Sequence, residues 1–153
     1  MSHISSLTTR IKSLDALKLA CEDMGFTFVD GQKTFAWFGR WMNDWRDERS
    51  AVAQGFDPAT FGKCEHAIRV PGTSYEIGVV PTADGDWVLH MDEYGPGRVL
   101  VEKAGQSGTK LAQAYAVRAT EASMARLRGT GVRLVGQVGV PGETIRLTYQ
   151  VGT

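Results

Sequence analysis

The chain has 153 residues, 42% hydrophobic and 22% charged, which are proportions typical of a globular protein. Lys plus Arg and Asp plus Glu both number 17, and this balance argues against a dedicated nucleic-acid binder, which usually has a basic excess. We expect a single domain over residues 1–153. The sequence has neither a secretory signal pattern nor an apolar run near the roughly 20 residues that cross a bilayer, so no membrane association is expected.

The first predicted elements are a strand and a helix. The stretch HISSLTTRI, residues 3–11, is rich in β-branched residues and favours a strand. In SLDALKLACEDMG, residues 13–25, apolar residues recur at helical spacing, Ser13 is the predicted N-cap and Gly25 the stop. Cys21 lies on the apolar face, which predicts a small core residue. The two cysteines, Cys21 and Cys64, form no disulfide framework, so we expect a cytoplasmic protein with reduced thiols.

Five strands are predicted in the middle of the chain. The turn residues DGQK separate the first two, over 26–30 and 33–42, and a charged loop follows over 43–62. Pro71-Gly72 joins the next two, because glycine takes the positive φ of a type II turn. Asp84-Gly85 is a hairpin signal before the fifth. The last three of these strands are EHAIRV, SYEIGVV and DWVLHMDEY, residues 65–70, 74–80 and 86–94.

The C-terminal third is predicted to hold the clearest helix and a final hairpin. Residues 95–108 read as a glycine-punctuated connection, and residues 109–128 as an alanine-rich helix. Strands over 132–140 and 144–151 flank Pro141-Gly142. Hairpins with only two helices predict an α+β fold, in which a mostly antiparallel sheet has both helices packed on one face as a two-layer sandwich.

A histidine and cysteine cluster is the first candidate site. His3, His66 and His90 fall on predicted strands, and Cys64 and Asp92 each lie two residues from a histidine, so they share its face. These residue types bind zinc, and Cys64 beside a histidine could serve as a nucleophile. However, the chain has no CxxC or HExxH spacing, and Cys64 opens a strand rather than a helix. A purely structural role for these residues, as packed side chains, is the better supported interpretation. No cofactor is predicted.

An anion site is the second candidate, at AGQSGTKL before the long helix. Glycines there would expose backbone N–H groups to a phosphate, with Gly105, Ser107, Gly108 and Lys110 as the candidate residues. The spacing is not that of a P-loop. Ser107 acting as N-cap of the helix explains the same residues without a ligand.

Clustered tryptophans are the third candidate. Trp37, Trp41 and Trp45 lie within nine positions and Arg46 follows, and both residue types are frequent anchors of protein interfaces. The alternative is aromatic core beside a solvated loop. A weaker reading is nucleic-acid binding by Arg69, Arg133 and Arg146 on the wet sheet face.

Three stretches resemble a known family. MSHISSLTTRIKSLDALKLACEDMG, KCEHAIRVPGTSYEIGVV and KLAQAYAV are similar to the opening, the middle block and the start of the long helix in the hypothetical chloroplast open reading frame thirty-five family. This is a family of unknown function from plastids, cyanobacteria, other bacteria and phages. The resemblance implies a compact α+β protein and no reaction. The matching residues of interest are Ser2, His3, Cys64, His66, Ala67, Tyr115 and Ala116.

The leading hypothesis is a cytoplasmic protein-binding or adaptor domain without catalysis, with a bacterial or phage accessory role implied by the resemblance. The alternative is a small enzyme or a metal- or ligand-binding protein that uses the histidine and cysteine cluster. Homo-oligomerisation is left open.

Overall fold

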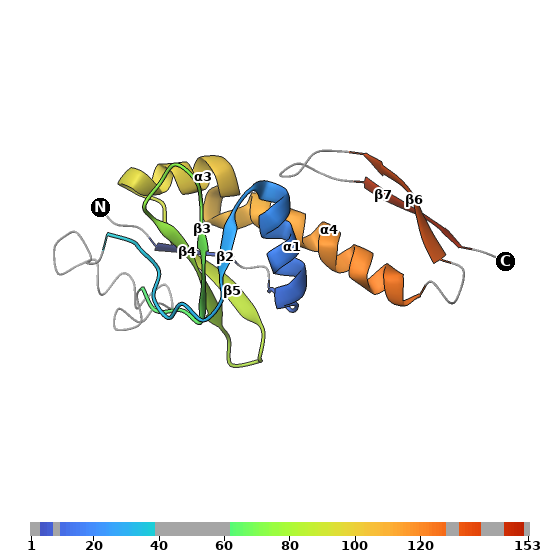
Figure 1. The fold of residues 1–153 in the computed structure, drawn as a ribbon, viewed down its shortest axis with the longest axis horizontal. Coiled ribbons are helices and arrows are strands. Elements are labelled where there is room, and N and C mark those ends of the chain that lie inside the picture. Colours follow the sequence, from blue (N-terminus) through green and yellow to red (C-terminus); the bar gives the residue numbers. More distant parts are fainter. Residues whose placement is uncertain (1–3, 8–9, 39–61, 128–131, 139–145, 152–153) are drawn as a thin grey trace.

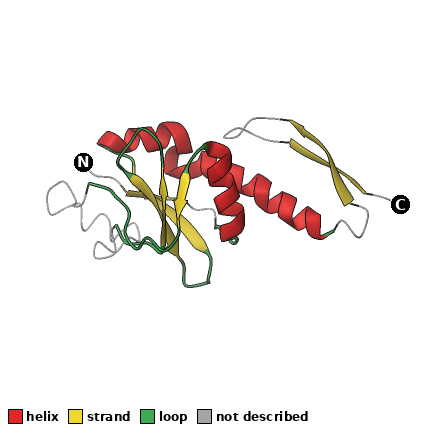
Figure 2. Cartoon of the chain, in the orientation of Figure 1, coloured by secondary structure: helices red, strands yellow, loops and turns green. Residues whose placement is uncertain are grey.

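The computed structural model describes residues 4–7, 10–38, 62–127, 132–138 and 146–151. The predicted α+β class is confirmed: the described residues form an antiparallel five-stranded sheet, a separate hairpin and three α-helices (Figures 1 and 2). The elements are β1 (Ile4–Ser6), α1 (Leu14–Met24), β2 (Thr27–Val29), β3 (His66–Arg69), β4 (Glu76–Pro81), β5 (Trp87–Asp92), the short 3₁₀ turn η2 (Gly95–Gly97), α3 (Arg98–Ala104), the 3₁₀ turn η3 (Gln106–Gly108), α4 (Thr109–Arg126), β6 (Val132–Val138) and β7 (Arg146–Val151).

The sheet has the strand order β1-β5-β4-β3-β2. Its two central hairpins follow from the predicted turns, because Gly72 and Gly85 adopt the positive φ values of 91° and 84° that their turns require. β3 pairs with β4 across the first turn, and β4 with β5 across the second. The opening quarter of the chain then adds an edge strand on each side.

One face of the sheet lies against the main hydrophobic core. Alternate strand residues such as Ile68, Ile77 and Leu89 are fully buried there. Side chains of all three helices join the same cluster, among them Leu17 of α1, Leu100 of α3 and Leu111 of α4, along with Cys21, which is 1% exposed as predicted. The placement of the helices as a simple two-layer sandwich remains a prediction.

Polar contacts fix α1 against α4. The Ser13 hydroxyl accepts from the Ala16 N–H at 3.2 Å, which confirms the predicted N-cap. The Tyr115 hydroxyl oxygen of α4 accepts from the backbone N–H groups of Lys12, at 2.9 Å, and Ser13, at 3.3 Å. A side chain of α4 therefore accepts hydrogen bonds from two backbone N–H groups at the start of α1.

Three sequence-based expectations are wrong. Residues 33–38 of the predicted strand 33–42 form no strand, and residues 39–42 lie outside the described residues. Among residues 33–38 only Thr34 makes an isolated bridge, to Lys63, because β2 pairs with β3 instead. Residues 95–108 contain α3, which buries Leu100 and Ala104 one turn apart. Ser107 is not the N-cap of α4: it lies in η3 with φ 55°, and Gly108 takes the cap position.

The final hairpin forms a sheet of its own. β6 and β7 pair with each other in the described chain, as expected, but they do not extend the five-stranded sheet. α4 runs from the core towards this hairpin and contacts β6 (Figure 1). No helix among the residues that the structure describes is long and apolar enough to cross a membrane.

Candidate functional site

The second face of the sheet, opposite the main core, has a depression at its centre. Ala67, Gly78 and His90 lie side by side across β3, β4 and β5. Gly78 has no side chain, and the ring of Phe35 fills the space: a Cβ on Gly78 would lie 2.7 Å from Cε1 of Phe35. Phe35 is 3% exposed and forms a second small hydrophobic cluster with Cys64 and Ala67. This face is therefore covered by chain that precedes the central strands.

The covering segment, residues 31–38, is called the strap. Its backbone is tied to the returning chain, because the Phe35 N–H donates to the Gly62 carbonyl and the Cys64 N–H to the Lys33 carbonyl, each at 2.9 Å. The Cys64 thiol donates to the Gln32 carbonyl at 3.2 Å. These contacts make a short clasp at the base of residues 36–61.

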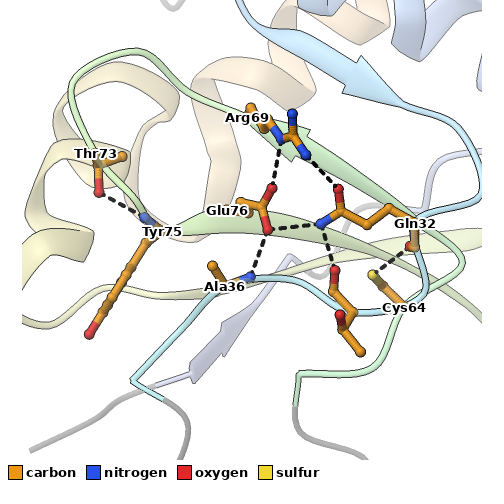
Figure 3. A network of polar contacts seen from close by, with 8 residues as sticks. Gln32, Ala36, Cys64, Arg69, Thr73, Tyr75 and Glu76 are labelled. Atoms are coloured by element: carbon orange, nitrogen blue, oxygen red, sulfur yellow. Dashed lines mark hydrogen bonds and ion pairs between the residues drawn. The ribbon is translucent and has the colours of Figure 1, made fainter.

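A polar network holds the strap to the sheet (Figure 3). The carboxylate of Glu76 accepts from the Ala36 N–H at 2.9 Å, from the Gln32 side-chain amide at 2.8 Å and from the Arg69 guanidinium at 3.1 Å. Gln32 also donates to the Thr34 carbonyl at 2.7 Å and accepts from Arg69 at 3.3 Å. The Glu76 side chain is only 12% exposed, and charge-assisted bonds of this kind are stronger than neutral ones. The network therefore fixes the position of the strap.

Beyond the network, the strap presents aromatic side chains near the surface. Trp37 is half-buried and lies over Gly62, where a Cβ would sit 3.0 Å from its Cδ1 atom. Phe38 is 37% exposed, and Tyr94 after β5 is 48% exposed. The buried carboxylate of Asp92 accepts from the backbone N–H of Phe38 at 3.2 Å and of Tyr94 at 3.0 Å. One carboxylate thus holds the backbones of Phe38 and Tyr94 close together, and both side chains are exposed.

Trp37, Phe38 and Tyr94 are called the aromatic patch. Of the predicted contact residues, Trp37 belongs to it, whereas Trp41, Trp45 and Arg46 lie outside the described residues. Sequence reasoning missed Phe38 and Tyr94, because their proximity depends on Asp92, which is distant from Phe38 in sequence.

The structure does not bring the predicted histidines together. His66 pairs with Val79 and His90 with Gly78, which are neighbours on β4, so the two imidazoles lie on opposite faces of the sheet. On the first face, Nδ1 of His66 accepts from the Gly31 N–H at 3.0 Å. On the second, burial lowers the pKa of His90 to about 4, so its imidazole is neutral at pH 7. His3 lies outside the described residues.

The cysteines are poorly suited to nucleophilic chemistry. Burial, reinforced by the charges of Glu76 and Glu65, raises the pKa of the Cys64 thiol to about 11. Burial also raises the pKa of Cys21 to about 12. Nucleophilic cysteines need the opposite shift. Over the described ranges, no group of three or more His, Cys, Asp or Glu side chains is arranged to hold a metal ion.

A carboxylate of the protein itself occupies the predicted anion loop. Gly105 and Gly108 have the expected positive φ values, 83° and 80°. The Ser107 N–H, however, donates to Oε1 of Glu93, which also accepts from the Ser5 hydroxyl at 2.6 Å. The Lys110 ammonium lies 3.2 Å from the Glu102 carbonyl oxygen instead of turning into the loop. Glu93 therefore supplies an anionic acceptor to one backbone N–H of this loop.

The three arginines of the nucleic-acid reading are divided between the two sheets. Arg69 lies on β3, where it pairs with Glu76 directly across the hairpin. Arg133 and Arg146 lie on β6 and β7. The three residues therefore do not lie on one sheet, contrary to the nucleic-acid reading.

Comparison with known proteins gave no match: no family model matches the chain, and searches of curated proteins and of solved structures returned no significant similarity.

Proposed function

We propose that the chain is a protein-binding domain of accessory or adaptor type, and that it contacts its partner through the aromatic patch. The observation that supports this is the pairing of Phe38 and Tyr94 on the Asp92 carboxylate, next to the half-buried Trp37. Aromatic side chains are enriched at protein interfaces, where they bury a large apolar area and lose little conformational entropy.

Rigid support is the second argument. The network around Glu76 and the ring of Phe35 fix the strap before any partner arrives, and such preorganisation lowers the entropic cost of association. The exposed residues of the patch add no charge, so apolar burial would drive binding. A chemical role for the histidines and cysteines has less support, because His66 and His90 lie on opposite faces and both thiol pKa values are raised.

The proposal includes a cytoplasmic location, supported by the two free, buried cysteines. Membership of the family that the sequence resembles, with its implied bacterial or phage accessory role, is likewise a proposal. It rests on the quoted sequence blocks alone.

The test is a pull-down from the native host with four forms of the chain: wild type, Phe38→Ala, Tyr94→Ala and Leu19→Ala. Leu19 is a matched control, because it is 42% exposed but lies on α1. We expect wild type and Leu19→Ala to retain the same partner and both patch variants to lose it. Circular dichroism must show all four folded. A partner retained at full strength by both patch variants would refute the site. The affinity of each variant for the captured partner should then be measured with purified proteins.

A further inference from the structure

The strand β7 pairs only with β6 among the described residues, and its sequence lacks the features that usually protect an edge strand. Edge strands normally carry prolines, bulges or several charges that prevent pairing with another chain. The segment Arg146–Val151, RLTYQV, has no proline or glycine and a single charge at its first position. By contrast, β6 contains Gly136 and an irregular register between Leu134 and Gly136. Of the two strands, β7 is the one suited to accept another.

The hairpin is also incompletely supported. Two-stranded ribbons are marginally stable in water and need further strands or a helix. α4 supplies a helix, but an open pocket of about 120 Å³ separates Leu147 of β7 from the helix, where it is lined by Gln113, Ala116, Val117 and Thr120. In the described chain β7 pairs with β6 alone. A third strand on β7 would supply the support that this partial helix contact does not.

We propose that two copies of the chain associate through β7, in antiparallel register centred on Thr148, and form a four-stranded sheet β6-β7-β7′-β6′. A two-fold axis through the sheet requires directly opposite residues to lie on the same face. Arg146, Thr148 and Gln150 are all exposed, as one face of the strand requires. This register places Arg146 opposite Gln150 and Thr148 opposite its own copy.

The sequence of β7 is compatible with pairing to itself. Directly opposed like charges destabilise a sheet, whereas Thr–Thr pairs stabilise it. The centred register has no opposed like charges, because the single charge, Arg146, faces a neutral amide. This self-complementarity favours a second copy over a foreign strand. The interface is independent of the aromatic patch, so either proposal can fail without the other.

The test begins with sedimentation velocity from about 5 to 200 μM, because small interfaces give weak, concentration-dependent association. We expect wild type to approach twice the 16.7 kDa mass of the chain. Thr148→Lys should weaken association by at least about tenfold, since two ammonium groups would then face each other. The matched control is Gln137→Lys on β6, which is also exposed and should associate as wild type does.

A charge-reversal pair separates strand pairing from misfolding. Thr148→Glu alone should also be monomeric, but an equimolar mixture with Thr148→Lys should restore the dimer. A Thr148→Cys variant should form an intermolecular disulfide under mild oxidation, because opposed strand residues lie within bridging distance. A monomeric wild type at 200 μM, undiminished association of Thr148→Lys, or failure of the mixture to associate would overturn the proposal.

Discussion

Gly78→Ala tests whether the strap covers the sheet by filling the space above a missing side chain. The new methyl group would lie 2.7 Å from Cε1 and 3.0 Å from Cγ of Phe35, a ring that is itself 3% exposed. Overpacking of this kind costs about 1–3 kcal/mol. Phe35→Ala should cost about 3–5 kcal/mol, because it removes a buried ring.

The double variant is decisive. Once the ring is absent, alanine at position 78 fits, and it should gain about 0.5–1 kcal/mol over glycine in a strand. The two substitutions are therefore expected to couple by about 2–3 kcal/mol, near the upper end for contacting residues. Urea unfolding followed by tryptophan fluorescence measures each corner of the cycle, and Gly78→Ala alone should lower the melting temperature by about 2–4 °C for each kcal/mol lost.

Gly85→Ala is the control for this cycle. Gly85 has φ 84° and nothing within 4 Å of a Cβ, so alanine there costs backbone strain alone, about 1–2 kcal/mol. That cost should be the same with and without Phe35. Equal costs of Gly78→Ala in both backgrounds would refute the reasoning, since the methyl group and the ring would then not compete for one space.

Three further outcomes are expected. Tyr115→Phe should cost about 1–3 kcal/mol in urea unfolding, because it removes the acceptor of two backbone donors at the start of α1. The Arg118 guanidinium holds the pKa of Asp23 below its usual value. This pair therefore stabilises the fold above the unfolded pKa, about 4, and the stabilisation is lost as the pH falls through the folded pKa. Asp23→Asn should reduce this loss of stability at acid pH by less than about 1 kcal/mol, because the pair is a third exposed. Cys21 and Cys64, with raised pKa values of about 12 and 11, should react with a thiol reagent at pH 8 only at the rate of unfolding, and rapid labelling of folded protein would contradict this.

The parts of the fold that depend on neighbouring residues could be predicted from the sequence. Pro71-Gly72 and Asp84-Gly85 encode their hairpins because the turn residues alone determine the geometry. Ser13 and Gly25 mark the ends of α1 for the same reason, since each cap acts within a few residues.

Contacts between distant residues account for the errors. The turn residues DGQK favour a local hairpin, but β2 pairs with β3 across more than thirty residues, and no local pattern indicates that choice. α3 was hidden because it has only seven residues, between glycines. The Glu93 carboxylate reaches the Ser107 N–H from another element, and the local residues that favoured Ser107 as N-cap give no sign of this contact.

Only part of the candidate site could be predicted from the sequence. Trp37 was found through its spacing from other tryptophans, but the patch needs Phe38 and Tyr94, which Asp92 unites. The ion pair of Arg69 with Glu76 could have been foreseen, because the Pro71-Gly72 turn places these residues opposite each other.

Because of the clasp between Thr34 and Lys63, the stability of the sheet depends little on the length of the chain between these two residues. The two ends of residues 36–61 are already held together, so lengthening that excursion costs only closure entropy, about 0.6 kcal/mol for each doubling. The length of chain between Phe38 and Gly62 can therefore vary while the strands beneath keep their register. Such a clasp lets insertions accumulate in this connection without changes to the core.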